Sequence, residues 1–524
     1  MKSFQSRFMI LCGGLILSLL PKISGEVFLK SGLSPREARF GTAVAVDGNT
    51  CVVGAPHENN GSGAAYVFSK NGDEWVLKQR LVANIEGIVT RGDYFGSSVS
   101  ISGDTIVVGA PLEDSGKVGD EIDNSAGGSG AVYVFRLSKG QWLREAYLKA
   151  PTPDPSAEFG ASIAIHLDRI AVGAWQEDRL GSTIYKGAGA VHVFQRGSQG
   201  WGFETKLSAP RPRQYAEFGY AVAVYQNIVV IGAPDDSRWF DDETGVVYLF
   251  AKGGGKWELR ERFTAGNADR YDRFGESVAF YGNRLAVGAT GEDSSGAWPN
   301  TMPDTNDARG SGAAYIFTSV GKNWVQEAFL KGTNAGGGGG GFGGSIALRG
   351  ETIVVGASGD DSGAGGNSGG AFVFKKEGGW IFKGYLQASN QGGGDSFGVS
   401  VALSTRAIII GAPLEDSSSV GANGLPNDLS RDAGAAYLYS NASFFNLPNP
   451  RVDRIRVPRS GAFVELIIGS QPGDVFDIYR SASLREGFGA PLFSGLPASL
   501  DATSTVFVDT NPIKKGGFYK IVRR

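Results

Sequence analysis

One pattern occurs seven times along this chain and constrains its fold more than any other feature. Each copy starts with Phe-Gly, runs through a short apolar stretch and a tight turn into an apolar segment that ends in Gly-Ala, and finishes with a strand-like aromatic segment. The Phe-Gly pairs are 55 to 68 residues apart and start at Phe40, Phe95, Phe159, Phe218, Phe274, Phe342 and Phe397. Because repeats extend a single body, the 524 residues do not by themselves indicate several domains.

The Gly-Ala landmark is as regular as Phe-Gly. Its glycines are Gly54, Gly109, Gly173, Gly232, Gly288, Gly356 and Gly411. Each copy contains four strand-length segments, which in the second copy are 98–101, 105–108, 131–135 and 142–148. A four-stranded antiparallel sheet cannot bury both faces alone, but seven sheets set radially around an axis can. The pattern predicts an all-β, seven-bladed β-propeller, with glycine at both landmarks where backbones crowd near the axis.

The fourth segment shows how the ring closes. It opens with a tryptophan in six copies, which we interpret as a wedge between blades: Trp75, Trp142, Trp201, Trp257, Trp324 and Trp380. The seventh copy has no such segment after Tyr439. Residues 26–31 copy the fourth segments that end at 150 and 332. We therefore expect the N-terminal strand to complete the seventh blade, which removes an open sheet edge.

These seven copies resemble FG-GAP repeats, the units of the integrin α-subunit propeller and of many secreted bacterial proteins. The resemblance covers residues 26 to 440 and implies a propeller that binds proteins. Integrin-type repeats often hold calcium in an Asp-x-Asp-x-Asp-Gly hairpin between the first two strands of a blade. Here the corresponding hairpins, such as 47–50 and 102–105, are too short and too poor in acids to wrap an ion.

The chain ends predict export and a second domain. Lys2 and Arg7 precede the apolar run 8–20, so residues 1–25 are interpreted as a signal peptide that leaves no membrane span in the mature chain. The propeller is assigned to 26–443, a linker to 444–451, and a small β-sandwich to 452–524. We expect a monomer that is secreted, periplasmic or attached to the cell surface.

The composition argues against several functions. A formal net charge of -3 provides no basic field for nucleic acid. The three histidines, His57, His166 and His192, are scattered, and Cys51 occupies an apolar strand position. No nucleophile motif or zinc-ligand spacing is present. We therefore expect that the protein is not an enzyme. The alternative is a polysaccharide lyase or hydrolase that uses loop carboxylates.

Acidic residues recur just after each Gly-Ala landmark. Pairs such as Glu113-Asp114 and Glu415-Asp416 are interpreted as acceptors for backbone N–H groups that fix the loops. The competing interpretation is cation binding. Calcium is considered only in the two long loops 112–125 and 292–307, whose additional acids are Asp120, Asp123, Asp304 and Asp307.

One face of the ring is the expected binding surface. Alternating strand directions place the loop after Gly-Ala and the loop before the next Phe-Gly on the same face. Aromatic residues outside the repeated strand positions collect there: Trp175, Tyr185, Trp239, Phe240 and Trp298. The sequence thus favours a non-catalytic scaffold that binds an extracellular protein or glycan, with a structural envelope protein as a further alternative. The tripeptide 91–93, Arg-Gly-Asp, is explained by the repeat, since Asp272 and Asp395 occupy the position of Asp93.

Overall fold

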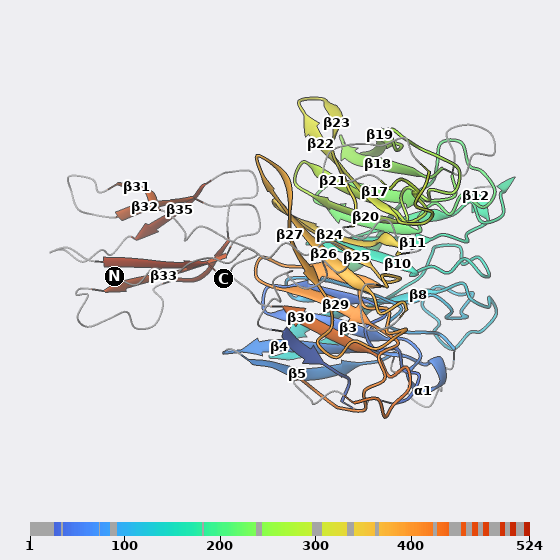
Figure 1. Ribbon diagram of the computed structural model, residues 1–524, viewed down its shortest axis with the longest axis horizontal. Coiled ribbons are helices and arrows are strands. Elements are labelled where there is room, and N and C mark those ends of the chain that lie inside the picture. The colour runs from blue at the N-terminus through green and yellow to red at the C-terminus, as the bar shows by residue number, and fades with distance from the viewer. Residues whose placement is uncertain are drawn as a thin grey trace, which may run out of the picture.

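The computed structural model describes residues 26–32, 35–72, 74–83, 92–180, 183–236, 244–295, 306–332, 340–361, 366–422 and 427–439, together with six strands between 452 and 523. Seven four-stranded antiparallel sheets form the blades of one propeller (Figure 1). The seven-bladed, all-β prediction is confirmed. Residues 1–25 lie outside the described part of the chain, as does the linker 444–451.

The first four blades follow the order of the chain. Blade one contains β2 (Val44–Asp47), β3 (Thr50–Ala55), β4 (Ala64–Asn71) and β5 (Glu74–Leu81). Blade two contains β6 (Ser98–Ser102), β7 (Thr105–Ala110), β8 (Ala131–Ser138) and β9 (Gln141–Leu148). Blade three contains β10 (Ser162–His166), β11 (Arg169–Ala174), β14 (Ala190–Gly197) and β15 (Gly200–Leu207). Blade four contains β16 (Ala221–Tyr225), β17 (Ile228–Ala233), β18 (Val246–Gly253) and β19 (Lys256–Phe263).

The remaining blades complete the ring with one strand taken from the front of the chain. Blade five contains β20 (Ser277–Tyr281), β21 (Arg284–Ala289), β22 (Ala313–Val320) and β23 (Asn323–Leu330). Blade six contains β24 (Phe342–Arg349), β25 (Thr352–Ala357), β26 (Gly370–Glu377) and β27 (Gly379–Leu386). Blade seven contains β28 (Ser400–Leu403), β29 (Ile408–Ala412), β30 (Ala435–Tyr439) and β1 (Glu26–Leu29), which pairs antiparallel with β30 from Glu26 opposite Tyr439 to Leu29 opposite Ala436.

The innermost strands of neighbouring blades contact each other all the way around the axis, and β28 contacts β2 where the ring closes. Glycine is required at these contacts. A Cβ added to Gly54 of blade one would lie 2.0 Å from the carbonyl oxygen of Gly96 in blade two, far inside van der Waals distance. The same approach joins every blade to the next, so the repeated landmarks exist because two backbones meet there.

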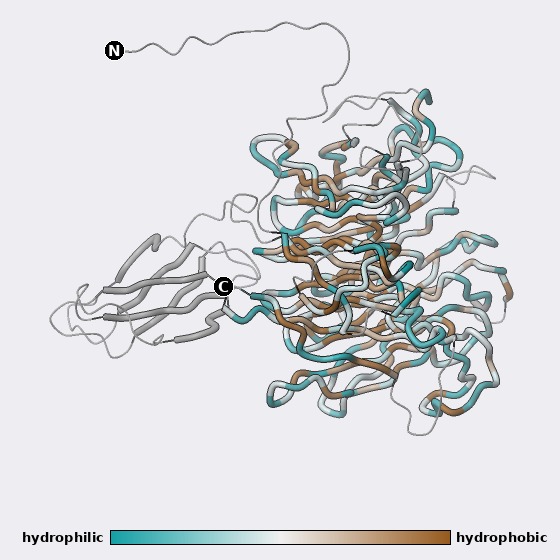
Figure 2. The backbone as a smooth tube through the Cα atoms, turned by 60° about the horizontal axis from the view of Figure 1, so that its bottom comes forward, coloured by the Kyte–Doolittle hydropathy of each residue, from teal (hydrophilic) through white to brown (hydrophobic). Residues whose placement is uncertain are grey.

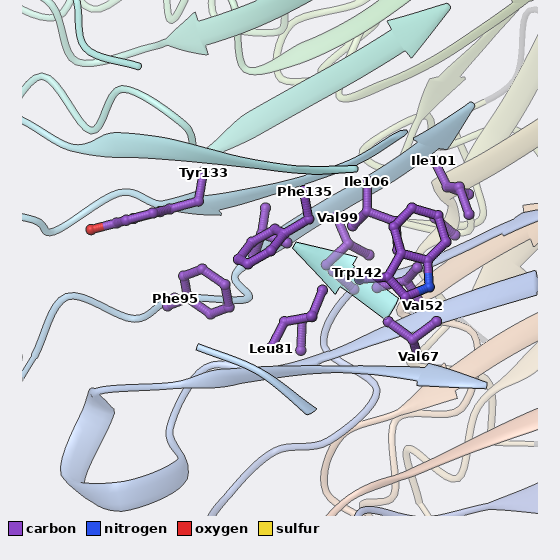
Figure 3. Close-up of a cluster of buried hydrophobic side chains, with 14 of the residues drawn as sticks. Val52, Val67, Leu81, Phe95, Val99, Ile101, Ile106, Tyr133, Phe135 and Trp142 are labelled. Atoms are coloured by element: carbon purple, nitrogen blue, oxygen red, sulfur yellow. The ribbon is translucent and has the colours of Figure 1, made fainter. Parts of the chain in front are cut away.

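Apolar side chains fill the spaces between blades. The phenylalanines of all seven Phe-Gly pairs are at most 2% exposed. Trp142 of β9 lies in one buried cluster with Val52 and Val67 of blade one and Ile101 of its own blade (Figure 3). It therefore packs between two blades, as expected. The hydropathy colouring shows apolar segments running through the body of the propeller, with hydrophilic residues at many of its loops and turns (Figure 2).

The loops that follow Gly-Ala meet the loops that precede the next Phe-Gly. The backbone N–H of Tyr94 donates to the carbonyl of Gly61, and that of Tyr215 donates to Lys186. The one short helix, among the described residues, is α1 (Glu58–Gly61), and a small hairpin is formed by β12 (Arg179–Leu180) and β13 (Thr183–Ile184). Both follow Gly-Ala landmarks, and their labels lie on the same side of the propeller in Figure 1. We call this side the loop face.

Two further sheets lie in the C-terminal region. One has the order β31-β32-β35, from β31 (Val452–Arg456), β32 (Val464–Gly469) and β35 (Ser504–Asp509). The other has the order β34-β33-β36, from β33 (Val475–Ser481), β34 (Phe493–Pro497) and β36 (Phe518–Arg523). The β-sandwich assignment for 452–524 stays a prediction.

Candidate functional site

The residue just before each Phe-Gly pair differs from blade to blade. It is Arg39, Tyr94, Glu158, Glu217, Arg273, Gly341 or Ser396, and each of the six non-glycine residues has a φ between 53° and 57°. This left-handed backbone is uncommon for residues with a side chain. The position precedes the innermost strand of each blade and therefore lies on the loop face.

Blades three to five supply an acidic cluster at this position. We call it the rim cluster and define it as Glu158, Trp175, Glu217, Tyr220, Asp235, Arg273 and Glu276. Its centre is Arg273, whose Nη1 lies 2.6 Å from Asp235, Nη2 3.4 Å from Glu217 and Nε 3.2 Å from Glu276. Three carboxylates from two blades thus share one guanidinium, which leaves the cluster with an excess of negative charge.

Aromatic rings form the apolar side of the rim cluster. The guanidinium of Arg273 lies over the ring of Tyr220, 5.5 Å from its centroid. Trp175 packs edge-to-face on Tyr220 with centroids 5.6 Å apart, and its Nε1 donates to Oε2 of Glu158 at 3.0 Å. These contacts hold the side chains of the group in place, so the surface is preorganised.

Partial burial changes the acid-base behaviour of the rim cluster. Burial, and then the charge of Asp235, raise the pKa of Glu217 to about 7. Burial also raises the pKa of Glu158. Although burial alone would lower it, the three surrounding carboxylates raise the pKa of Arg273 above its ordinary value. The cluster therefore gains negative charge near neutral pH as Glu217 loses its proton.

Exposed rings lie near the same position. Tyr215 and Tyr271 stand two residues before Glu217 and Arg273, and their exposed fractions are 59% and 56%. The guanidinium of Arg270 lies 4.6 Å from the ring centroid of Tyr271. Large exposed aromatic side chains beside a preorganised polar group are typical of protein contact surfaces.

Of the five aromatic residues expected to form the binding surface on the loop face, the structure describes two. Trp175 is half-buried in the rim cluster, and Tyr185 is half-buried beside the β12–β13 hairpin, where its N–H donates to Asp178. Trp239, Phe240 and Trp298 lie outside the described residues. Sequence reasoning missed Glu217, Arg273, Tyr215 and Tyr271. The available signal was the blade-specific variation directly before an otherwise invariant Phe-Gly.

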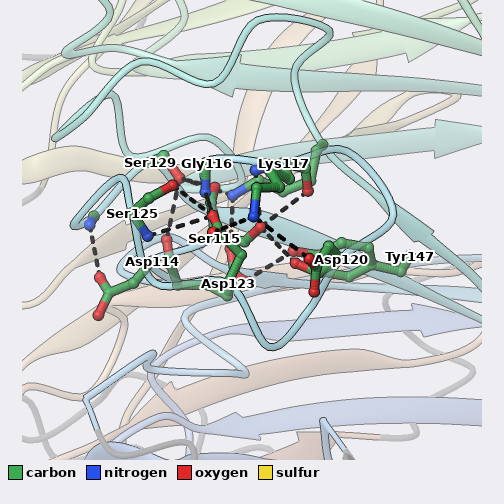
Figure 4. Close-up of polar contacts among 12 residues, drawn as sticks. Asp114, Ser115, Gly116, Lys117, Asp120, Asp123, Ser125, Ser129 and Tyr147 are labelled. Carbon is green, nitrogen blue, oxygen red and sulfur yellow. Dashed lines mark hydrogen bonds and ion pairs between the residues drawn. The ribbon is translucent and has the colours of Figure 1, made fainter.

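The calcium candidates of blade two contact a lysine. Nζ of Lys117 lies 2.9 Å from Oδ1 of Asp123 and 3.8 Å from Oδ2 of Asp120 (Figure 4). The other oxygen of Asp123 accepts bonds from Gly116 N and Ser125 Oγ. Asp307 accepts a bond from the N–H of Ser295, and Asp304 lies outside the described residues. Within the described ranges, no group of three or more His, Cys, Asp or Glu side chains is arranged to hold a metal.

The recurring acids play two structural roles. The acid four residues after each landmark glycine is buried, with 1 to 3% exposure: Glu58, Glu113, Glu177, Asp236, Glu292, Asp360 and Glu415. In the five blades that have an acid at the next position, that acid accepts a backbone N–H bond across the loop, as expected; Asp114 accepts from Gly128 at 2.8 Å. In several blades the buried acid meets a cation, as Glu58 meets Arg80 at 2.6 Å.

Three buried lysines that pair with these acids were missed by sequence reasoning. Lys30, Lys149 and Lys331 are at most 3% exposed, and they pair with Glu415, Glu113 and Glu292 of their blades at 2.8, 2.6 and 2.5 Å. The signal was present in the copied segments 26–31, 145–150 and 327–332, which share a lysine at their fifth residue. A buried lysine needs a charged partner, so this shared position indicated the ion pair.

The remaining singled-out side chains are packed within the fold. His192 is 2% exposed and its Nε2 lies 2.7 Å from Oε2 of Glu177, and the ring of His166 lies tilted against that of Tyr225 with centroids 4.7 Å apart. Cys51 is buried, and this burial raises its pKa. Asp93 of the Arg-Gly-Asp tripeptide is 8% exposed, while Arg91 lies outside the described residues.

Comparisons with known proteins agree with this geometry. The family model "FG-GAP repeat" matches residues 36–68, 75–135, 142–194, 201–250, 257–317, 324–374 and 380–439. Mouse integrin alpha-2 is 31% identical over 163 residues, which are 29% of this chain and 12% of that relative. Bovine integrin alpha-2 is 30% identical over 152 residues, 27% of this chain and 12% of the relative. The chain thus matches about an eighth of the length of these relatives.

The Saccharomyces cerevisiae Sqt1 crystal structure superposes with a TM-score of 0.40 at 10% identity, covering 85% of this chain and 96% of that one. Among the described residues, no helix has the length and apolar character needed to span a membrane. The family model covers most of the chain, and each of its seven matches includes residues of all three inner strands of one blade. The chain belongs to the FG-GAP repeat family.

Proposed function

We propose that this protein is a non-catalytic extracellular binding scaffold that holds a protein or glycan on its loop face. The observation that carries the proposal is the rim cluster. There acidic, basic and aromatic side chains from three blades lie together and are fixed by mutual contacts. Residues that are held rigidly on a scaffold but vary between otherwise equivalent units are typical of recognition surfaces. Similarity to integrin alpha-2 supports a binding role.

The rim cluster and its exposed neighbours define the contact chemistry. Tyr215 and Tyr271 supply apolar rings with a polar tip, and the carboxylates around Arg273 supply negative charge and hydrogen-bond acceptors. Tyrosine suits protein and sugar partners alike, since its ring stacks while its hydroxyl forms hydrogen bonds. The alternative of a carboxylate-based lyase or hydrolase draws on Glu217, whose pKa of about 7 suits a general acid.

Binding to a panel of purified extracellular proteins and a glycan array tests the proposal. The variant Tyr215→Asn/Tyr271→Asn removes both exposed rings and keeps a residue that tolerates the left-handed backbone found there. We expect affinity for the partner identified with the intact protein to fall at least tenfold, about 1.4 kcal/mol or more. The melting temperature should stay within a few degrees.

A matched control lies on the opposite face. Leu167, in the β10–β11 hairpin, is also exposed, apolar and left-handed, so Leu167→Asn makes a similar change away from the loop face. The change Trp239→Ala/Trp298→Ala probes the remaining aromatic residues. If the Leu167 variant loses binding while the tyrosine variant binds fully, the site lies on the face opposite the loop face and the proposal is wrong. Polysaccharide cleavage abolished by Glu217→Gln would favour the enzyme.

A further inference from the structure

A lysine, an asparagine and a glutamate meet inside the fifth blade, and the proposed binding role uses none of them. Nζ of Lys331 lies 2.5 Å from Oε2 of Glu292, and Nδ2 of Asn267 donates to Oε1 of the same carboxylate at 3.0 Å. Lys331 is fully buried and Glu292 is 2% exposed. One buried carboxylate therefore contacts an amine and a carboxamide at once.

The carbonyl of this carboxamide is polarised from its other side. The hydroxyl of Tyr315 donates to Oδ1 of Asn267 at 2.9 Å. Burial, with the charge of Glu292, raises the pKa of Tyr315 well above its ordinary value, so the hydroxyl keeps its proton and stays a donor. A donor aimed at a carbonyl oxygen stabilises the negative charge that develops there when a nucleophile attacks the carbon.

The seventh blade repeats the arrangement with different residues from distant parts of the chain. Lys30 lies 2.8 Å from Oε2 of Glu415, and Nδ2 of Asn390 donates to Oε1 at 2.8 Å. The hydroxyl of Tyr437 donates to Oδ1 of Asn390 at 2.7 Å. The lysine Nζ also faces a phenylalanine ring in each blade, Phe28 at 5.9 Å and Phe329 at 6.0 Å. Two blades thus carry the same lysine, glutamate, asparagine, tyrosine and phenylalanine.

The second blade differs at one point. Lys149 lies 2.6 Å from Oε2 of Glu113, but Oε1 of that carboxylate accepts a bond from the hydroxyl of Tyr147 at 2.8 Å. Blades five and seven have Phe329 and Phe28 at the place of Tyr147. An asparagine contacts the glutamate in the two blades that have phenylalanine, whereas the tyrosine hydroxyl takes the same oxygen in blade two.

We propose that Lys331 and Asn267, and in the same way Lys30 and Asn390, join in self-formed isopeptide bonds. A proton passes from the lysine ammonium to the glutamate carboxylate and leaves a neutral amine beside a carboxylic acid. The amine nitrogen attacks Cγ of the asparagine, the new C–N bond forms, and the tyrosine hydroxyl stabilises the oxyanion. The Cγ–Nδ2 bond then breaks.

The atoms balance without any added reactant. The glutamic acid gives its proton to the leaving nitrogen and takes back one from the attacking nitrogen, so ammonia departs and the glutamic acid is left protonated. Burial of the lysines favours the neutral amine that this step needs. Desolvation lowers the pKa of Lys331 and of Lys30, although the paired glutamates oppose the shift.

One of the two bonds would lie at the ring closure. Lys30 follows β1, the strand from the front of the chain, and Asn390 lies between β27 and β28, so their bond would lock the closing strand to the ring. Lys331 follows β23, while Asn267 lies in the connection from blade four. After residue 25 the chain has one cysteine, Cys51, and therefore cannot use an internal disulfide for this purpose.

The mass of the intact protein tests the proposal. We expect the purified protein to weigh about 34 Da less than its sequence from the observed N-terminus, about 17 Da for each ammonia lost. Trypsin should fail to cleave after Lys30 and Lys331, and each lysine peptide should be found joined to the peptide with Asn390 or Asn267. A full sequence mass with linear lysine peptides overturns the proposal. A mass deficit of a single ammonia overturns the proposal for the blade whose lysine and asparagine peptides are found unlinked.

Variants separate the chemistry from the fold. Glu292→Gln keeps the shape of the side chain but cannot carry the proton, so the mass deficit should fall by about 17 Da while circular dichroism stays unchanged. Asn267→Ala should have the same effect on the deficit. Lys149→Arg, in the blade with Tyr147, should show the same mass deficit as the unsubstituted protein. A cross-linked Glu292→Gln variant would overturn the role of the glutamate.

Discussion

Gly411 of the seventh blade packs directly against the carbonyl oxygen of Gly41 in the first blade, where an added Cβ on Gly411 would lie only 1.9 Å from that oxygen. This is the same contact that joins the other neighbouring blades. It differs from the others because it links the two ends of the repeat array. Ring closure therefore favours glycine at position 411, because a Cβ there would clash with the backbone of Gly41.

Gly411→Ala should loosen this closure. The backbone φ of Gly411 is not positive, so the penalty comes from the clash with Gly41 alone. We expect the free energy of unfolding to fall by about 1–3 kcal/mol or more, as for an overpacked core. Thermal melting measures the effect. Gly202→Ala in β15 is the control, since its added Cβ would have no neighbour closer than 4.0 Å. Equal melting temperatures for both variants would contradict the requirement for glycine.

Removal of residues 26–31 should expose the edge of β30. The deletion takes away Phe28 and Leu29, which are 6% and 0% exposed, and each is worth roughly 1.5–3 kcal/mol when fully buried. We expect aggregation or a markedly lower melting temperature, because β30 loses its antiparallel partner.

A milder comparison avoids the risk of a chain that cannot be purified. Leu29→Ala should destabilise by about 2–5 kcal/mol, and Val27→Ala, at a half-buried position of the same strand, by less. Chemical denaturation measures both. A deletion variant that melts like the intact protein would show that β1 does not hold the seventh blade.

Two buried aspartates predict a loss of stability as the pH rises. Burial is the main reason that the pKa of Asp272 is raised to about 7 and that of Asp395 to about 6. In an unfolded chain both values would be 3.8. The folded state therefore binds more protons than the unfolded state between about pH 4 and 7. The stabilisation is complete below pH 4 and is lost as the pH rises through 6 and 7.

The double variant Asp272→Asn/Asp395→Asn removes both titrations and keeps a side-chain oxygen for the N–H bonds from Asp269 and Gly392. Its melting temperature relative to the intact protein should increase from pH 4.5 to 7.5. Asp120→Asn, in an exposed loop, is the control and should show no such trend. A constant difference across this range would contradict the prediction.

The sequence by itself determined the architecture, because every blade repeats the same local requirements. Phe-Gly and Gly-Ala mark positions where a ring is buried and two backbones touch, and both are visible as residue types. The number of blades, the strand order within them and the origin of the closing strand follow from counting the copies. Periodic patterns are readable because the same physical constraint recurs at a constant place in each unit.

Only the tertiary structure decided which side chains meet between blades. Glu217 and Arg273 are 56 residues apart and occupy the same place before Phe-Gly in two copies, but only the packing of adjacent blades brings them within 3.4 Å. Lys30 and Glu415 are 385 residues apart and form a fully buried pair because the ring joins the two ends of the chain. A repeat records the contacts within one unit, whereas such sites depend on unlike residues in neighbouring units, and that proximity exists only once the ring has closed.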